Sequence, residues 1–169
     1  MPTHIAIINP KSPQNMGSIL RAAGCYQALS IRYTGERYAR AKAFSTDTKN
    51  AHLKISVTHV DAVIDPIKDK HLTKVAVELV EGATPLPLFE HPEQALYIFG
   101  PEDGSIEQDV VDQCDHLVYI PTVGCMNLAA TVNVLLYDRM AKTTAMPLGD
   151  EVIKNSRDTN NRTKAKLSN

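Results

Sequence analysis

The sequence has no apolar run that approaches the roughly 20 residues a membrane-spanning helix needs. Cysteine is scarce: Cys25, Cys114 and Cys125 are widely spaced and form no C-x-x-C pair. This pattern argues against a disulfide framework or a zinc site and fits a reducing cytoplasm. The six histidines show no H-E-x-x-H or similar ligand spacing. The N-terminal MPTHIAIINP begins a strand at once and lacks the basic start of a signal peptide. We therefore expect a cytoplasmic protein without a membrane span or a catalytic metal.

Several ligand-binding and catalytic motifs are also missing. The chain contains neither G-x-G-x-x-G nor a Walker P-loop, so a dinucleotide or a nucleoside triphosphate is a poor fit. It has no G-x-S-x-G elbow either, which argues against a serine hydrolase. The net charge is −1, so any basic surface that attracts nucleic acid must be local.

Short apolar runs instead alternate with helical patterns along the chain. Strands are predicted over residues 4–8, 29–33, 56–60, 74–80, 95–99 and 116–120, and helices over 16–26, 61–65, 106–113 and 127–142. This alternation predicts an α/β fold, with a mostly parallel sheet flanked by helices. We expect a single domain over residues 1–147 and a polar, mobile tail over 148–169.

The helix predicted from Asn127 to Lys142 is apolar on nearly all sides. Such a helix is buried on more than one side, and the sheet can cover only one of them. A second copy of the chain is the simplest cover for the other, so we predict a homodimer. Asn127 stands at the helix start. It is either an N-cap, a role that asparagine favours, or a ligand contact, because helix starts present unpaired N–H donors.

Three loops that follow predicted strands combine glycine, proline and polar residues. They cover residues 9–17, 99–104 and 120–127. If the strands are parallel, all three loops open at one edge of the sheet, where α/β proteins bind ligands. Glu102 then lies near Asn127, and the helix that carries Arg21 begins beside them. Alternatively, Gly100–Gly104 is a simple turn and Arg21 is a surface salt-bridge residue. The spacing of these residues predicts a ligand pocket but does not indicate a reaction.

A local excess of basic residues, interleaved with aromatic ones, extends from Arg32 to Lys54. Its members include Arg32, Arg37, Arg40 and Lys42. Basic side chains reach phosphates and aromatic rings stack on unpaired bases, so this region is a candidate RNA contact. The alternative is a solvated loop that binds nothing.

Three ordered motifs at these loops resemble those of SpoU/TrmH-type RNA methyltransferases of the SPOUT superfamily. The first is N-P-x-x-P-x-N-x-G-S-I-x-R-A-A-G over residues 9–24, the second is F-G-P-E-D-G over 99–104, and the third comprises I-P at 120–121 and M-N-L at 126–128. The resemblance extends from about residue 4 to residue 142. It implies methyl transfer from S-adenosylmethionine (AdoMet) to a ribose 2′-hydroxyl in tRNA or rRNA.

The resemblance also implies features that spacing alone does not predict. These are a deep trefoil knot in the C-terminal third, an obligate dimer, and an active site in which the motif-one arginine of one subunit serves the cofactor of its partner. By position, the cofactor contacts would be Leu79, Gly100, Ile120, Cys125, Met126 and Leu128.

Arg21 matches the catalytic arginine of the family. A guanidinium is a poor base because its pKa lies above about 12, so we expect Arg21 to stabilise a developing alkoxide or to grip the adjacent phosphate. Asn15 and Glu102 would position Arg21 and the loops, and Asn127 would hold the ribose or the knot loop. Cys125 stands where many members have serine. A thiol is a weaker hydrogen-bond partner, so only a backbone contact to the cofactor carries over.

Two other functions stay open at this point. One is a non-catalytic, knotted RNA-binding dimer, against which the joint presence of Arg21, Glu102 and Asn127 argues. The other is an RNA methyltransferase directed at a base nitrogen, although the pattern of Arg21 and Asn127 favours the ribose.

Overall fold

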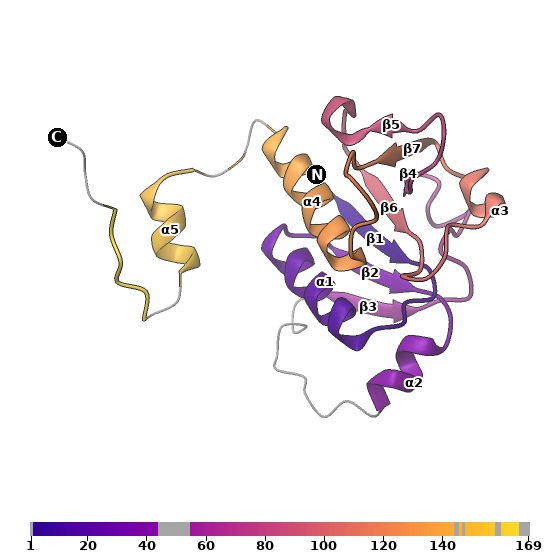
Figure 1. Ribbon diagram of the computed structural model, residues 1–169, viewed down its shortest axis with the longest axis horizontal. Coiled ribbons are helices and arrows are strands. Elements are labelled where there is room, and N and C mark those ends of the chain that lie inside the picture. Colours follow the sequence, from indigo (N-terminus) through magenta and orange to yellow (C-terminus); the bar gives the residue numbers. More distant parts are fainter. Residues whose placement is uncertain (1, 44–54, 144–145, 147, 158–159, 166–169) are drawn as a thin grey trace.

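The computed structural model describes residues 2–43, 55–143, 146, 148–157 and 160–165. Within these ranges, seven strands form one sheet in the order β3-β2-β1-β6-β4-β7-β5 (Figure 1). The strands are β1 (Thr3–Ile7), β2 (Ser30–Tyr33), β3 (Ser56–His59), β4 (Thr73–Val77), β5 (Thr84–Pro85), β6 (Ala95–Phe99) and β7 (His116–Tyr119). The helices are α1 (Pro13–Cys25), α2 (Arg37–Ala43), the 3-10 helix η1 (Leu86–Leu88), α3 (Gln108–Val111), α4 (Leu128–Ala141) and α5 (Asp150–Ser156).

The sheet confirms the predicted α/β class. Every neighbouring pair among the described strands is parallel. All five residues of β6 are buried, as expected for a central strand covered on both faces. The proline-containing segment after β4 forms only the short edge strand β5 and then η1. Proline has no backbone N–H to donate to a neighbouring strand, so it is confined to the edge of a sheet.

Two apolar layers cover the two faces of the sheet. On one face, α1 and α4 pack on each other and on side chains such as Ile5, Tyr97 and Phe99. The opposite face carries a smaller cluster around Leu96 and Ile98, covered by loop residues and the segment before α3. The larger of the two layers thus contains both α1 and α4, and the two helices begin at the same edge of the sheet (Figure 1).

Helix α4 confirms the prediction for the C-terminal apolar stretch. It runs over residues 128–141, with Asn127 as N-cap and Lys142 as C-cap. Val132, Leu135 and Leu136 are fully or almost fully buried, whereas Val134 and Tyr137 remain 38% and 52% exposed. The side of α4 turned away from the sheet is therefore apolar and uncovered within the described chain. No helix in the described ranges is long and apolar enough to cross a membrane.

Helix α1 begins three residues earlier than predicted. Its N-cap is Ser12, whose hydroxyl accepts from the backbone N–H of Asn15 at 3.3 Å, and Pro13 occupies the first helical position. Serine at the cap followed by proline is a known helix-start signal. The predicted start at Met16 was wrong because Ser12 and Pro13 were assigned to the loop over residues 9–17.

The helix predicted over residues 61–65 does not form. Bends lie at Asp61 and Val63, and a turn follows over 66–71. The side chain of Asp69 determines this conformation, since it accepts from the backbone N–H of Asp65 at 2.8 Å and pairs with Arg32 at 2.7 and 2.8 Å. Tertiary pairing thus overrides the local helical pattern.

Two short α-helices of the described ranges lie outside the predicted set, as does the 3-10 helix η1. Helix α2 follows β2 in the basic region, and α5 lies in the segment expected to be a mobile tail. Every residue of α5 is exposed except Val152, and Figure 1 shows the helix apart from the sheet and its layers. The mobility of this segment stays a prediction.

Five polar side chains connect the last turns of α4 to the segment before β6. We call this set the His91 cluster: His91, Tyr97, Asp138, Arg139 and Lys142. The two ring nitrogens of His91 lie 2.6 Å from the Tyr97 hydroxyl and 2.9 Å from Asp138. Arg139 is buried and donates to Tyr97 and to two backbone carbonyls before β6, while Lys142 pairs with Asp138 at 2.7 Å. Burial raises the pKa of Tyr97 to about 12, so its hydroxyl stays protonated.

The His91 cluster predicts a pH dependence of stability. Burial lowers the pKa of His91 below its ordinary value of 6.5, and the hydrogen bond to Asp138 opposes this only in part. Below pH 6.5 the unfolded chain therefore binds more protons at this residue than the folded chain does, and stability falls until the folded pKa is passed. Urea unfolding midpoints measured from about pH 7.5 to about pH 5 should fall more steeply for the unmodified protein than for His91→Gln. Equal slopes would contradict this account of His91.

Candidate active site

The carboxyl ends of β4, β6 and β7 and the start of α4 border a cavity of about 280 Å³. β4 lies between β6 and β7 in the sheet, so the loops that follow these three strands meet. The predicted loops follow β1, β6 and β7, which are parallel strands of the same sheet. Asn15, Glu102 and Asn127, one from each loop, all line the cavity, which confirms that the loops open at one edge. All six residues that the resemblance assigned to the cofactor line the cavity: Leu79, Gly100, Ile120, Cys125, Met126 and Leu128. Their role in binding stays a prediction.

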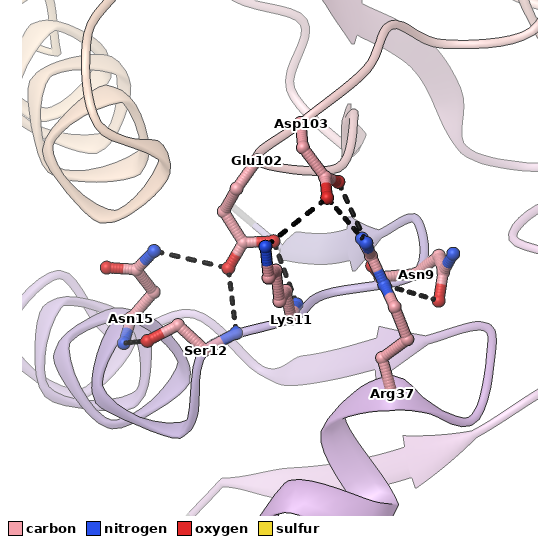
Figure 2. A network of polar contacts seen from close by, with 7 residues as sticks. All are labelled: Asn9, Lys11, Ser12, Asn15, Arg37, Glu102 and Asp103. Atoms are coloured by element: carbon pink, nitrogen blue, oxygen red, sulfur yellow. Dashed lines mark hydrogen bonds and ion pairs between the residues drawn. The ribbon is translucent and has the colours of Figure 1, made fainter.

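A chain of hydrogen bonds joins the three motifs beside the cavity. The side-chain amide of Asn127 donates to the side-chain oxygen Oδ1 of Asn15 at 3.0 Å. The amide of Asn15 in turn donates to Glu102 at 3.2 Å (Figure 2). The structure thus brings together three of the four predicted catalytic residues, from segments up to 112 positions apart.

Glu102 also holds the start of α1. Its carboxylate accepts from the backbone N–H groups of Lys11 at 2.8 Å and Ser12 at 3.0 Å (Figure 2). Partial burial acts to raise the pKa of Glu102, but the hydrogen bonds from Ser12, Lys11 and Asn15 outweigh it and keep the pKa below its ordinary value. Glu102 is therefore ionised, and both of its carboxylate oxygens accept hydrogen bonds from residues of the first motif. These contacts suit a residue that positions the loops better than one that takes up a proton.

Asn127 performs the capping role that its position predicted. Its side-chain oxygen Oδ1 accepts from the backbone N–H groups of Ala129 at 2.9 Å and Ala130 at 3.3 Å. The same side chain uses its amide for Asn15. Cap and bridge are thus compatible functions of one side chain, and the contact of Asn127 with a ligand stays a prediction.

Gly100 and Glu78 shape the floor of the cavity. A Cβ atom at Gly100 would lie 3.1 Å from Glu78 Oε2 and 3.3 Å from the backbone nitrogen of Ile106, closer than ordinary contact. Glu78 accepts from the backbone N–H groups of Leu79 at 2.9 Å and Ile106 at 3.1 Å. Sequence reasoning missed Glu78. The available signal was a carboxylate directly after a buried strand, at the edge where the other motifs end.

Arg21 is not part of the hydrogen-bond chain that joins the other three predicted catalytic residues. It is exposed on α1, is not among the residues that line the cavity, and makes no hydrogen bond or ion pair within the described residues. Its side chain therefore remains available to a ligand or to another chain.

The four predicted RNA contacts have different surroundings. Arg32 is largely buried in its two-point pair with Asp69, which occupies its guanidinium. Arg37 is partly exposed and Arg40 exposed, both on α2 near the first motif. Lys42 belongs to the same helix, but its side chain lies outside the described residues. Arg32 therefore fits a structural role, and the α2 residues are the ones that a ligand can reach.

The described residues contain no group of three or more histidine, cysteine, aspartate or glutamate side chains that could hold a metal ion. The cavity instead combines apolar side chains such as Leu79, Ile120 and Leu128 with backbone and amide groups. Such a lining is typical of a site for an organic molecule with a few fixed polar contacts.

Fold and cavity together define an α/β protein whose ligand site lies at the carboxyl edge of a parallel sheet. The family model described as the SpoU rRNA Methylase family matches residues 2–137. The chain therefore belongs to the SpoU rRNA methylase family.

Individual relatives agree with this assignment. The chain is 26% identical over 156 residues to the tRNA (cytidine-2′-O-)-methyltransferase TrmJ of Methanocaldococcus jannaschii, an alignment that covers 82% of this chain and 67% of that protein. The AdoMet-bound rRNA methyltransferase of Sinorhizobium meliloti has a similar fold, with 19% identity, a TM-score of 0.62, and coverage of 83% of this chain and 56% of that one. The SpoU methyltransferase AviRb of Streptomyces viridochromogenes, in complex with AdoMet, gives 20% identity, a TM-score of 0.66, and coverage of 80% and 58%. The chain thus spans about two thirds of TrmJ and little more than half of these two structures.

Proposed function

We propose that this protein transfers a methyl group from AdoMet to a ribose 2′-hydroxyl of tRNA or rRNA. One observation carries the proposal: the cavity at the carboxyl edge brings all six predicted cofactor contacts together beside the Asn15–Glu102–Asn127 chain. The relative TrmJ is named as a tRNA 2′-O-methyltransferase, and two structures of similar fold contain AdoMet. Both facts support the same reaction.

The cavity has the properties that AdoMet requires. Apolar side chains of Leu79, Ile120 and Leu128 offer a surface for the adenine ring, and the backbone of Gly100 lines the same cavity. AdoMet supplies a methyl group on a positively charged sulfur, so the reaction needs no further activation of the donor. The task left to the protein is to align the two reactants and to help the hydroxyl lose its proton.

We assign the electrostatic part of this task to Arg21. A guanidinium stays protonated at any physiological pH, so it can stabilise negative charge on the ribose oxygen or hold the adjacent phosphate. Glu102, Asn15 and Asn127 act as positioning residues, because their polar atoms are engaged with one another and with the starts of α1 and α4.

The exposed position of Arg21 is explained if the active unit is a homodimer. Arg21 lies on the outer side of α1, and the uncovered apolar residues Val134 and Tyr137 lie on α4, which packs against α1. A second copy docked on this surface would bury Val134 and Tyr137. In this arrangement each Arg21 serves the cavity of the partner subunit. A trefoil knot formed by the passage of the chain into α4 remains part of the proposal, as does a cytoplasmic location.

Calorimetric titration with AdoMet tests the first step. Saturable binding is expected for the unmodified protein. Gly100→Val should abolish it, because the valine side chain must displace Ile106 and Glu78, and Glu78 lines the cavity. Gln94→Ala, at the other end of β6, serves as the control and should bind normally. A non-catalytic RNA-binding dimer, the main alternative, predicts no AdoMet binding by any of the three proteins.

A further inference from the structure

A single carboxylate stands between two basic side chains at the outer edge of the site. Both oxygens of Asp103 accept from Arg37 Nη1 at 2.8 Å, and Lys11 Nζ lies 3.6 Å from the same carboxylate (Figure 2). The side chains of Lys11, Arg37 and Asp103 are 65%, 33% and 47% exposed. A dissolved anion can therefore reach all three groups.

The guanidinium of Arg37 is held in place independently of Asp103. Its Nη2 donates to the backbone carbonyl of Asn9 at 2.6 Å, and its Nε to the same carbonyl at 3.2 Å. Asn9 adopts the left-handed conformation with φ of 44°, directly before the first motif continues into α1. Arg37 would thus keep its orientation if the Asp103 carboxylate moved away.

Three basic side chains gather around this group. Arg40 lies one turn beyond Arg37 on α2, is exposed, and has no ion pair within the described residues. Lys11, Arg37 and Arg40 carry three positive charges. The nearby carboxylates other than Asp103 are engaged elsewhere: Glu102 accepts from the backbone of Lys11 and Ser12, and Glu36 pairs with His59. The side-chain hydrogen bond from Arg37, which outweighs slight desolvation, keeps the pKa of Asp103 below its ordinary value, so this carboxylate is ionised at neutral pH.

The group also adjoins the cavity. Asp103 directly follows Glu102, which lines the cavity and accepts from the backbone N–H group of Lys11. An RNA chain with one ribose at the cavity must place neighbouring phosphates on the surface around it. A planar guanidinium and an ammonium group that already share one two-oxygen anion are a suitable receptor for a phosphate.

We propose that Asp103 occupies, in the free protein, the position between Lys11 and Arg37 that a backbone phosphate of the bound RNA takes. The inference rests on the proposed function and adds where the RNA backbone lies. A tethered carboxylate is present at a high effective concentration, so a free phosphate or mononucleotide competes with it poorly. A polymer that is also held at the cavity and at Arg40 competes well. Asp103 therefore favours long RNA over small anions.

Fluorescence anisotropy with end-labelled, unfractionated tRNA and no AdoMet tests this inference. Asp103→Asn keeps the shape but removes the competing charge, and should bind the tRNA about two- to fivefold more tightly, the range expected for an exposed ion pair. Arg37→Gln should bind more weakly. Inorganic phosphate, added as competitor, should displace tRNA from Asp103→Asn at lower concentration than from the unmodified protein.

The matched control is Glu93→Gln, which removes one negative charge just before β6, at the opposite end of that strand from Asp103. In the double variant Asp103→Asn/Arg37→Gln the gain in affinity should vanish, because the two residues act through the same contact. The proposal is overturned if Glu93→Gln binds as tightly as Asp103→Asn, or if the gain survives without Arg37. Methyl transfer by the unmodified protein, measured on the same tRNA and on rRNA, separates the two claims. Transfer without an Asp103 effect overturns only this inference, whereas no binding of and no transfer to either RNA overturns the proposed function as well.

Discussion

Replacing Arg21 by alanine is expected to lower the rate of methyl transfer by a factor on the order of 10²–10³, the usual effect of losing one charged donor at a reacting oxygen. Folding should be unaffected, because Arg21 is exposed and makes no hydrogen bond or ion pair within the described residues. AdoMet affinity should also be unchanged, because Arg21 does not line the cavity. Single-turnover transfer to RNA, together with calorimetric AdoMet binding and thermal unfolding, measures all three quantities.

A rate within a fewfold of normal would contradict the assignment of Arg21. Arg21→Lys adds a second distinction. It retains the positive charge but loses the planar fork of donors, so it should recover part of the rate if charge alone matters and little if two-point contact is needed.

The same variant tests the composite site. If each Arg21 serves the cavity of its partner, Arg21→Ala mixed with Gly100→Val should form heterodimers in which one site has both an intact cavity and an intact arginine. Activity should then reappear on mixing two nearly inactive proteins. No recovery, with subunit exchange shown by mass spectrometry, would place Arg21 and the cavity of one subunit in the same site.

Replacing Glu102 by glutamine should weaken both folding and AdoMet binding. The carboxylate accepts from Lys11, Ser12 and Asn15, whereas a glutamine amide must turn N–H groups towards one of these donors. Loss of a hydrogen bond to a charged group typically costs about 1.5–3 kcal/mol of stability. Since Glu102 also joins the first motif to the loop after β6, the cavity should lose its shape and AdoMet affinity should fall. Urea unfolding and calorimetry measure the two effects.

Glu107→Gln is the matched control, because Glu107 is exposed at the start of α3 and makes no capping hydrogen bond. The unmodified protein should also lose the contribution of Glu102 as the pH falls. Its folded pKa lies below the ordinary value of 4.5, so this contribution is complete above pH 4.5 and disappears as the pH passes through the folded pKa. If Glu102→Gln unfolded and bound AdoMet like Glu107→Gln, Glu102 would have no positioning role.

Local signals were sufficient for the central elements of the fold. The five buried residues of β6 form one apolar run, and α4 begins at the asparagine that its sequence marks as a cap. The start of α1 was equally local, with Ser12 as cap and Pro13 in the first position, but the two residues also suit a turn. In that case the pattern was present and its interpretation was wrong.

Pairings between distant segments could not be predicted. Asp69 pairs with Arg32, 37 positions away, and accepts the backbone N–H of Asp65 that a helix over residues 61–65 would use. The spacing of apolar residues does not indicate such a contact. For the same reason, Arg32 looked like a member of a basic RNA-binding region although its guanidinium is paired with Asp69. The pair between Arg37 and Asp103 spans 66 positions. The order of the motifs predicted that their loops meet, but not which side chains join them.

The position of the transferred methyl group tests the central claim most directly. RNA is incubated with the protein and AdoMet labelled in its methyl group, and is then hydrolysed in alkali, which cleaves the chain only where a 2′-hydroxyl is free. Methylation of the ribose oxygen predicts that the label appears in alkali-stable dinucleotides, and that Arg21→Ala removes it. Label in mononucleotides would place the methyl group on a base and contradict the account, and so would the absence of label from every tRNA and rRNA tested.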